Sequence, residues 1–417
     1  MKHLLRLILV SFLGLAFLFP AHAQAEKNIT VFMDGLAVPF DVNPTVMNGR
    51  TLVPFRALAE NLNVAVTWDA NTRTIAATDS QTSISLQIGT PIALRNGSTV
   101  SLDMSPLIIN GRTLVPLRFF SEAFGCQVVW DETAHSIKIT SPPRTMTTVG
   151  FYALGDQETS SWTNLFGQTF PESAKGNTDV IKSLALGWYS LDQEGNLLTT
   201  SRTGWQRPDD YQKVLEAAGK YQLKTEMVIH LTDGDNTITN LLSDEGAMQQ
   251  AIEMITEEAG IYQGVNLDFE GLGWQDSAEE LIHTRESFSY FANQLVDRLH
   301  AKNLKLTLTL HAPNSAYQGY DYQKLGQIAD KIIVMAYDYG SKPEPASRVI
   351  EAVEAAVQAV PAEKLLLGIS VPNETPDSII TKVGIAKRYG LNGIALWRLG
   401  LVSNEMWNSL RATVQAI

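Results

Sequence analysis

The sequence predicts an α/β protein with a C-terminal (β/α)8 barrel, the TIM-barrel fold, preceded by a small α+β domain built from two repeats. Strand and helix candidates alternate from residue 147 to residue 417, and a seven-residue motif occurs twice between residues 29 and 140. A proline-containing segment, 141–144, separates the two regions. Alternating strands and helices favour a parallel sheet, because each helix returns the chain to the same edge of the sheet.

The C-terminal region contains eight short apolar strand candidates, which lie at 148–154, 183–189, 224–231, 264–270, 305–311, 331–337, 364–371 and 393–397. Amphipathic helix candidates lie between most of them, notably 245–259, 278–302 and 346–360. Eight such units in about 270 residues match a closed barrel. An open doubly wound sheet is the alternative, but no Gly-x-Gly-x-x-Gly phosphate loop follows the first strand.

The N-terminal region contains an internal repeat. The motif Asn-Gly-Arg-Thr-Leu-Val-Pro at 48–54 recurs 62 positions later at 110–116, and Trp68-Asp69 recurs as Trp130-Asp131 at the same spacing. Each unit predicts a strand, an Asn-Gly hairpin turn, a helix and a two-stranded hairpin. The helices are expected at 55–61 and 117–124, and the hairpins pair 65–68 with 74–77 and 127–130 with 136–139.

Residues 1–23 have the three parts of a secretory signal peptide: a basic start, an apolar run and the small-x-small site Ala21-His22-Ala23. We therefore expect a secreted protein that leaves the membrane after cleavage. Without Lys2 and Arg6, 30 of the 32 basic residues remain against 44 acidic residues, a net charge of −14. This balance argues against nucleic acid and anionic lipid as partners.

One strand candidate, 264–270, carries polar residues where a parallel sheet is normally apolar. Side chains alternate along a strand, so Asn266, Asp268 and Glu270 share one face. Burying such groups without partners costs several kcal/mol, so three in a row are rare in a purely structural strand. An edge strand with a solvated face is the alternative. The pattern favours an active-site strand whose last residue, Glu270, lies at the barrel mouth.

The ends of the other strands supply aromatic and polar side chains, which suit the recognition of sugars. These residues are Tyr152, Trp188, His230, His311, Tyr337, Asp338, Glu374, Trp397 and Arg398. Isolated histidines at strand ends are more often hydrogen-bonded wall residues than metal ligands, so we expect no metal and no cofactor. Glu374 is expected to be a solvated loop residue.

The N-terminal repeat resembles the copper amine oxidase N-terminal domain, through the Asn-Gly-Arg-Thr-Leu-Val-Pro-x-Arg pattern present in both units. This resemblance implies a spacer or a cell-wall-associated module spanning residues 29–140. His135 is the only histidine there, so the region has no copper-ligand spacing.

The C-terminal region, 147–417, resembles family 18 glycoside hydrolases of the bacterial spore and cell-wall branch. Three segments carry the resemblance: Gly-Val-Asn-Leu-Asp-Phe-Glu at 264–270, Met-Ala-Tyr-Asp-Tyr at 335–339 and Gly-Ile-Ala-Leu-Trp at 393–397. They correspond to the family's Asp-Gly-x-Asp-x-Asp-x-Glu, Met-x-Tyr-Asp and final tryptophan strand. The second strand also carries Trp188-Tyr189 before an Asp-x-x-Gly turn.

The resemblance implies substrate-assisted, retaining hydrolysis of β-1,4-linked polymers that contain N-acetylglucosamine. It assigns catalysis to Glu270 as acid and base, to Asp268 as the residue that orients the substrate acetamide, and to Tyr337 as its hydrogen-bond donor. The substrate-binding residues it implies are Asn266, Tyr152, Trp188, Met335, Asp338 and Trp397. The implied partner is an N-acetylated glycan polymer, either peptidoglycan or chitin.

Two positions depart from the family pattern, because Gln263 and Asn266 replace its first two aspartates. We expect a shifted pH profile or lower activity. A catalytically weak, lectin-like cell-wall protein is the alternative, and a structural wall protein is a third. The sequence does not distinguish peptidoglycan from chitin or endo from exo cleavage.

Overall fold

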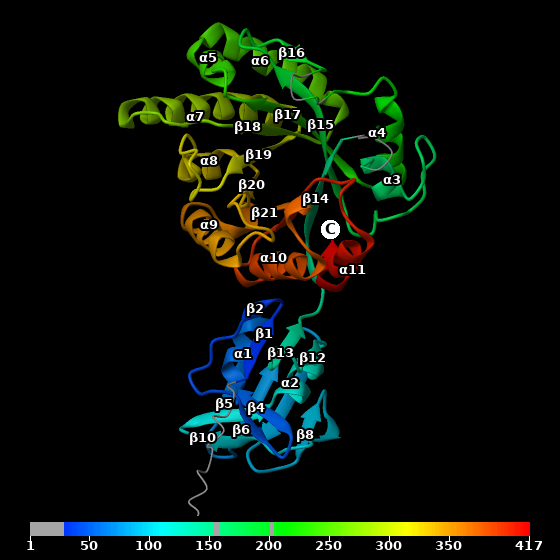
Figure 1. Ribbon diagram of the computed structural model, residues 1–417, viewed down its shortest axis with the longest axis vertical. Helices are drawn as coiled ribbons and strands as arrows, with labels where there is room; N and C mark the ends of the chain where they lie inside the picture. Colours follow the sequence, from blue (N-terminus) through cyan, green and yellow to red (C-terminus); the bar gives the residue numbers. More distant parts are fainter. Residues whose placement is uncertain (1–28, 154–158, 201–203, 205) are drawn as a thin grey trace, which may run out of the picture.

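The protein has two bodies joined by the segment 141–144 (Figure 1). The computed structural model describes residues 29–153, 159–200, 204 and 206–417. The predicted signal peptide, 1–23, lies outside the described residues. No helix in the described part of the chain is both long and apolar enough to cross a membrane.

The C-terminal body is a closed barrel of eight parallel strands, which confirms the predicted fold class. Its strands are β14 (Arg144–Tyr152), β15 (Ser183–Leu191), β17 (Lys224–Thr232), β18 (Gly264–Glu270), β19 (Lys305–His311), β20 (Lys331–Met335), β21 (Leu365–Ser370) and β22 (Gly393–Trp397). The barrel closes because β14 pairs with both β15 and β22. The short β16 (Leu197–Leu198) and β23 (Val414–Ala416) flank β15 and β14.

Helices surround the barrel (Figure 1). They are α3 (Ser161–Phe166), α4 (Tyr211–Lys220), α5 (Thr237–Ser243), α6 (Glu245–Glu258), α7 (Ala278–Ala301), α8 (Tyr322–Ile328), α9 (Ala346–Ala359), α10 (Pro376–Arg388) and α11 (Asn404–Thr413). Single 3-10 turns occur at Ala259–Ile261, Ala362–Lys364 and Val371–Asn373. The three helices predicted from the sequence are confirmed, each ending one residue earlier than expected.

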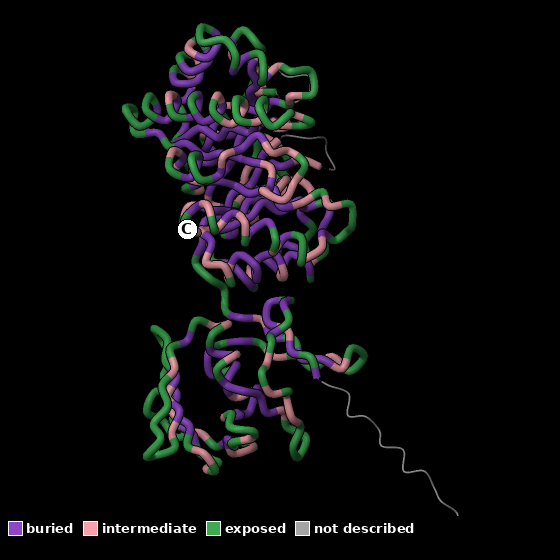
Figure 2. Tube along the Cα trace, turned by 90° about the vertical axis from the view of Figure 1, so that its left-hand side faces the viewer, coloured by how far each residue is buried: buried purple, intermediate pink, exposed green. Residues whose placement is uncertain are grey.

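The two faces of β18 have different environments, as its alternating sequence predicts. The outward face is apolar, and the ring of Phe269 lies 5.9 Å from the rings of Phe288 and Phe291 on α7. Helix α7 begins at a capping box formed by Ser277 and Glu280, which fixes where this helix covers the strand. The polar residues of β18 therefore face the barrel interior, and all of them except Glu270 are buried. Buried residues are concentrated in the middle of the C-terminal body (Figure 2).

Much of the remaining interior surface of the barrel is apolar. Its buried cluster consists of Val149, Phe151, Ala185, Val228, Ile333, Leu366 and Ala395, with Trp397 packed against it. The polar residues are concentrated on neighbouring strands β17, β18 and β19. The interior thus has an apolar side and a polar side, and the polar side leads to Glu270.

The N-terminal body contains both predicted repeat units. Its elements are β1 (Thr30–Met33), β2 (Leu36–Ala37), β3 (Thr45–Met47), β4 (Arg50–Pro54), α1 (Phe55–Leu62), β5 (Ala65–Asp69), β6 (Thr74–Thr78), β7 (Ser83–Gln87), β8 (Ile92–Arg95), β9 (Ser98–Ser101), β10 (Leu107–Ile109), β11 (Arg112–Pro116), α2 (Leu117–Ala123), β12 (Gln127–Asp131) and β13 (Ser136–Thr140). The Asn-Gly turns and both C-terminal hairpins form as expected.

The two units are related by an approximate two-fold axis, which the sequence did not reveal. Strands β4 and β11 pair antiparallel with Val53 opposite Val115, its own counterpart 62 positions later. Ion pairs across the units follow the same relation: Arg50 Nε contacts Asp103 Oδ2 at 2.7 Å, and Arg112 contacts Asp41. Self-pairing of the repeated motif explains why it occurs in both units.

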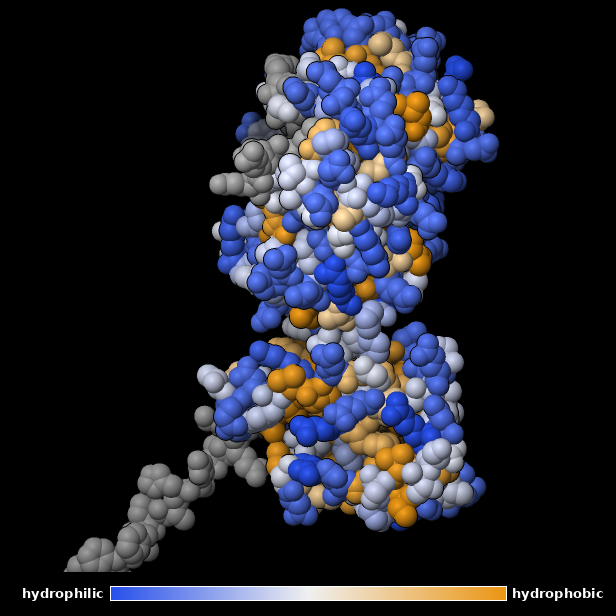
Figure 3. Space-filling view, turned by 90° about the vertical axis from the view of Figure 1, so that its right-hand side faces the viewer, coloured by the Kyte–Doolittle hydropathy of each residue, from blue (hydrophilic) through white to orange (hydrophobic). Residues whose placement is uncertain are grey.

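Each unit also leaves apolar side chains on the surface. Trp68 and Trp130 are exposed at equivalent positions, as are Val46 and Ile108. The space-filling view shows hydrophobic areas on the N-terminal body (Figure 3).

The β1–β2 hairpin docks against α10 of the barrel. Asp34, at the hairpin turn, accepts hydrogen bonds from Ser141 N at 2.8 Å and Ser141 Oγ at 2.5 Å, and lies 3.7 Å from Lys387 Nζ. Leu36 is buried in the core cluster of the barrel domain. The corresponding hairpin of the second unit, β8–β9, has Gly97 where the first has Gly35. A Cβ added at Gly97 would have open space around it.

We predict that Gly35→Ala weakens domain docking more than Gly97→Ala. Both glycines have a left-handed φ, +74° and +79°, so alanine at either costs roughly 1–2 kcal/mol in backbone strain. At Gly35 the new Cβ would also lie 2.0 Å from Thr381 Oγ1 of α10, so the helix or the hairpin must move. Limited proteolysis of the segment 141–144 and urea denaturation measure the effect. Equal behaviour of the two variants would contradict this docking.

Candidate active site

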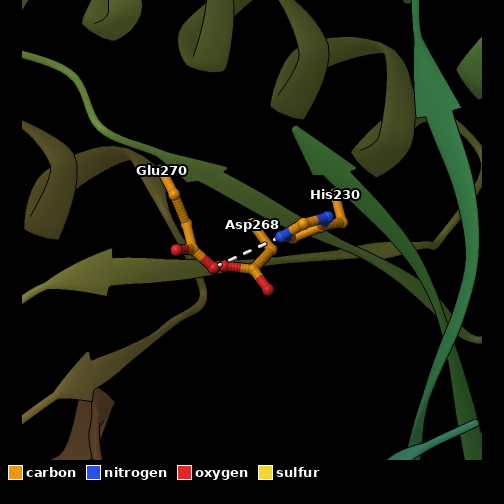
Figure 4. A group of neighbouring side chains, drawn as sticks. All are labelled: His230, Asp268 and Glu270. Atoms are coloured by element: carbon orange, nitrogen blue, oxygen red, sulfur yellow. Dashed lines mark ion pairs between the residues drawn. The ribbon is translucent and has the colours of Figure 1, made fainter. Parts of the chain in front are cut away.

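Glu270 ends β18 at the C-terminal mouth of the barrel, between two histidines. Its Oε1 lies 3.3 Å from His230 Nε2 of β17, and its Oε2 lies 3.9 Å from His311 Nε2 of β19. About a third of the Glu270 side chain is exposed, since its relative accessibility is 31%. His230, Asp268 and Glu270 converge on one point (Figure 4). The sequence placed Glu270 at the mouth, and the structure adds its contact with His230.

Asp268 lies one layer below Glu270 and is 2% exposed. Its Oδ1 has no hydrogen-bond partner among the described residues. Burial raises the pKa of Asp268 well above its ordinary value, the Glu270 charge raises it further, and His230 opposes both. The Asp268 carboxyl group is therefore harder to ionise than an exposed aspartate.

The pKa values of the two histidines are shifted in opposite directions. Burial lowers the pKa of His230, but the contact with Glu270 and the charges of Asp268 and Glu270 outweigh it, so the net shift is upward. Burial lowers the pKa of His311 despite the charges of Glu270 and Asp338. The His311 ring also stacks on Tyr317 at 4.1 Å. His230 is thus the more readily protonated of the two histidines beside Glu270.

Asn266 is fully buried beneath Asp268 and accepts a hydrogen bond from Thr309 Oγ1 at 2.8 Å. We expected it to contact substrate. Because it has no exposed surface, the structure places it instead as a support inside the barrel.

Met335 and Tyr337 lie at the end of β20. Met335 is buried and pairs in register with His311. The Tyr337 ring packs on Gly368, where an added Cβ would lie 3.3 Å from Cε1. Burial raises the pKa of Tyr337, and the charges of Asp268 and Glu270 raise it further, so the phenol stays neutral and can donate a hydrogen bond. Its position is compatible with the role predicted for it.

Asp338 is exposed and has a left-handed backbone, with φ of 64°. Glu344, which is 3% exposed, holds this turn by accepting hydrogen bonds from Asp338 N at 2.9 Å and Tyr339 N at 3.1 Å. Asn373 Nδ2 donates to both acids, to Asp338 Oδ1 at 3.1 Å and to Glu344 Oε1 at 2.8 Å. The sequence analysis missed Glu344, because nothing in its local pattern marks it as buried.

Glu374 is not the solvated loop residue that we expected. Its side chain is 1% exposed and pairs with Lys382 Nζ of α10 at 3.1 Å. Lys382 Nζ also donates to the carbonyl oxygen of Glu344 at 2.8 Å. A buried carboxylate requires such a partner. The partner lies eight positions away on the next helix, and no local sequence pattern indicates that the two side chains meet.

Trp397 ends β22 and is partly buried, with its ring edge-to-face to Phe151 at 5.4 Å. Its contact with a sugar ring stays a prediction. Tyr152 and Trp188 are each 1% exposed and belong to the core between the strands and the helices. Strand alternation explains this, since Phe151 faces inward and Tyr152 therefore faces outward. We no longer expect these two residues to contact substrate.

Among the described residues, one cluster could hold a metal ion. It consists of His230, Asp268 and Glu270, whose ligand atoms lie within 4.8 Å of one another. A carboxyl–imidazole cluster of this kind equally serves acid–base chemistry, for which a cation is unnecessary. The absence of a metal stays a prediction.

Glu226 is a buried acid that the sequence analysis overlooked. It lies inside the barrel on β17, is 7% exposed, and accepts a hydrogen bond from Thr307 Oγ1 at 3.0 Å. A signal was present, because Glu226 and His230 are four positions apart and thus share a strand face.

Each of the two bodies contains a segment that matches a known protein family. Residues 32–139 match the copper amine oxidase N-terminal domain, and residues 200–373 match glycosyl hydrolases family 18. The chain is 29% identical over 142 residues to a cortical fragment-lytic enzyme of Bacillus subtilis (strain 168), covering 31% of this chain and 31% of that protein. It is 24% identical over 245 residues to an uncharacterized glycosylase of the same organism, YvbX, covering 52% and 65%. The chain therefore spans less than two thirds of either relative.

Solved structures share the fold. The spore cortex-lytic enzyme SleL of Bacillus megaterium QM B1551 has a TM-score of 0.54 at 15% identity, covering 76% of this chain and 80% of that chain. A chitinase of Chromobacterium violaceum ATCC 12472 has a TM-score of 0.52 at 19% identity, covering 64% and 98%. At these identities the likeness shows the fold alone. The chain thus has a (β/α)8 barrel in which residues 200–373 match glycosyl hydrolases family 18, behind an N-terminal body in which residues 32–139 match the copper amine oxidase N-terminal domain.

Proposed function

We propose that the protein is a glycoside hydrolase that cleaves β-1,4 linkages in polymers containing N-acetylglucosamine. The observation that carries the proposal is the position of Glu270, partly exposed at the barrel mouth beside the buried Asp268. A general acid must reach the glycosidic oxygen and still keep a proton near neutral pH. A second carboxyl group, that of Asp268, and the imidazole of His230 lie beside Glu270 at this position.

The reaction proceeds in two steps. Glu270 donates a proton to the glycosidic oxygen as the bond to the anomeric carbon breaks, while the carbonyl oxygen of the substrate's 2-acetamido group bonds to that carbon. Glu270, now a carboxylate, then takes a proton from the water that attacks the same carbon from the opposite side, and the bond between that carbon and the acetamido oxygen breaks, which restores the acetamide. The configuration is retained without an enzyme nucleophile.

Asp268 and Tyr337 suit the acetamide group. The unpartnered Oδ1 of Asp268 is an acceptor for the acetamide N–H, and the neutral phenol of Tyr337 is a donor for its carbonyl oxygen. Trp397 supplies an aromatic face for the sugar ring, and Asp338 supplies a polar contact at the rim.

The substrate class and the location of the enzyme are parts of this proposal. The relatives are named for cortex lysis or as chitinases, which supports peptidoglycan or chitin as the polymer. The sequence of residues 1–23 supports export, and the net charge of −14 suits a neutral glycan better than an anionic wall polymer. The N-terminal domain would then act at the cell wall as a spacer or a binding module.

A lectin-like protein remains the second candidate, because Gln263 and Asn266 depart from the family pattern. Gln263 is structural in this chain: its Oε1 accepts a hydrogen bond from Thr225 N at 2.7 Å, at the start of the neighbouring strand. The departure at Gln263 therefore does not by itself favour loss of catalysis.

We predict that Glu270→Gln lowers kcat by about 100-fold or more, because the amide cannot deliver the proton. Release of reducing ends from purified peptidoglycan and from soluble chitin oligomers measures it. Glu279→Gln, an exposed substitution in the first turn of α7, is the control and should behave as wild type. Equal, negligible rates for all three proteins together with tight glycan binding would favour the lectin.

We predict that His230→Gln moves the alkaline limb of the pH–rate profile to higher pH. The pKa of His230 is raised, so its imidazole carries positive charge at neutral pH more often than an unperturbed histidine. That charge lowers the pKa of Asp268, and its removal lets the carboxyl pair keep the last proton to higher pH.

The control for His230 is His300→Gln. His300 is exposed and pairs with Asp330 at 2.9 Å, near the start of β19 and thus at the opposite end of the barrel. Its profile should match wild type. An unchanged alkaline limb in His230→Gln would show that the imidazole does not couple to the carboxyl pair.

A further inference from the structure

We propose that Glu226 is a positioning residue that, through Asn266, sets the environment of Asp268. The role in catalysis rests on the function proposed above, whereas the contact between Glu226 and Asn266 is testable without it.

Glu226 lies at the base of the polar side of the barrel interior. Residues 226, 228 and 230 share the inward face of β17, since Val228 belongs to the interior cluster and His230 reaches Glu270. Glu226 is therefore two layers below His230, as Asn266 is two layers below Glu270 on β18. The inward face of β18 is thus polar in three successive layers, and β17 places one polar side chain on either side of the apolar Val228.

Hydrogen bonds fix one end of each side chain. Thr307 Oγ1 donates to Glu226 Oε1 at 3.0 Å, and Thr309 Oγ1 donates to Asn266 Oδ1 at 2.8 Å. The remaining polar atoms, Glu226 Oε2 and Asn266 Nδ2, are both buried and have no partner at hydrogen-bond distance among the described residues. One is an acceptor and the other a donor.

These two atoms belong to neighbouring side chains. The amide of Asn266 is close enough to lower the pKa of Glu226, in opposition to the burial that raises it. Burial of an unpaired polar atom is costly, so a small adjustment that joins Nδ2 to Oε2 is favourable. Glu226 then fixes one end of the Asn266 amide, and Thr309 fixes the other.

The pair explains why position 266 is an amide in this chain. An aspartate there would stand between Glu226 and Asp268, and three carboxyl groups in a dry interior cannot all ionise. Burial raises the pKa of Glu226, and Lys331, Thr307, Asn266 and Lys224 each act to lower it. With an amide at position 266, the buried carboxyl group at this depth is that of Glu226 on β17. The neighbour of Asp268 on the next layer down, Asn266, is then uncharged.

Four proteins test the proposal: wild type, Asn266→Asp, Glu226→Gln and the double variant, which moves the carboxyl group from position 226 to position 266. We expect Asn266→Asp to lower kcat/KM and to move the acid limb of the pH profile to higher pH, because the added carboxylate disfavours ionisation of Asp268. Glu226→Gln alone should lower kcat/KM less than Asn266→Asp does, since a glutamine oxygen still accepts from the Asn266 amide. In the double variant, Glu226→Gln should restore about tenfold of the lost kcat/KM, as expected for side chains in contact, and return the acid limb towards its wild-type position.

The matched control removes a buried carboxyl group elsewhere. Glu374→Gln, at the ion pair with Lys382, should not rescue Asn266→Asp. Additive effects of Asn266→Asp and Glu226→Gln on both kcat/KM and the pH profile would overturn the proposal.

Urea denaturation of the same four proteins separates this proposal from the enzymatic one. If wild type hydrolyses no glycan, the proposed function fails, but the contact still predicts coupling. The midpoint should fall in Asn266→Asp and recover in the double variant at pH 7. Independent midpoints would show that the two side chains do not interact.

Discussion

The burial of the Asp268 carboxyl group imposes conditions on the strands around it. Inside a barrel, a carboxyl group without a hydrogen-bond donor either keeps its proton or needs a nearby cation. Here β18 supplies Glu270 above it and β17 supplies His230 beside it, so proton and charge are distributed over three side chains. The neighbouring β19 supplies threonines, which satisfy buried polar atoms without adding charge. The polar residues therefore occupy three adjacent strands, and the rest of the barrel packs as an ordinary apolar core.

The buried Asp268 carboxyl group also has an unsatisfied oxygen atom that a substrate could satisfy. The fold leaves Asp268 Oδ1 without a hydrogen-bond partner among the described residues, and under the proposed function this atom accepts from the acetamide N–H of the substrate. A substrate N–H at that position would satisfy an atom that the fold itself leaves unsatisfied. Binding energy is then available where charge develops during the reaction, which is the requirement for transition-state stabilisation.

Much of the fold followed from local patterns, and the site followed only in part. The barrel strands and the three clearest helices were predictable because their periodicity spans whole elements. Glu270 and Asp268 were predictable because three polar residues with strand alternation are rare in a buried strand. Tyr152 and Trp188 were misplaced because strand ends were considered without the alternation that turns them outward. Glu374 and Glu344 required knowledge of Lys382 and of a loop conformation, both of which arise from tertiary packing.

Helix α10 lies between the N-terminal body and a loop of the candidate site and contacts both. On one side Gly384 lies against Asp34 of the β1–β2 hairpin, where an added Cβ would meet the Asp34 carbonyl oxygen at 2.4 Å. From the same helix, Lys382 pairs with Glu374 and with the carbonyl oxygen of Glu344, the residue that holds the Asp338 turn. A helix fixed by contacts with the N-terminal body therefore also supports a loop of the candidate site. The N-terminal body thus contacts, on one side of α10, the helix whose Lys382 holds the Glu344 loop on the other.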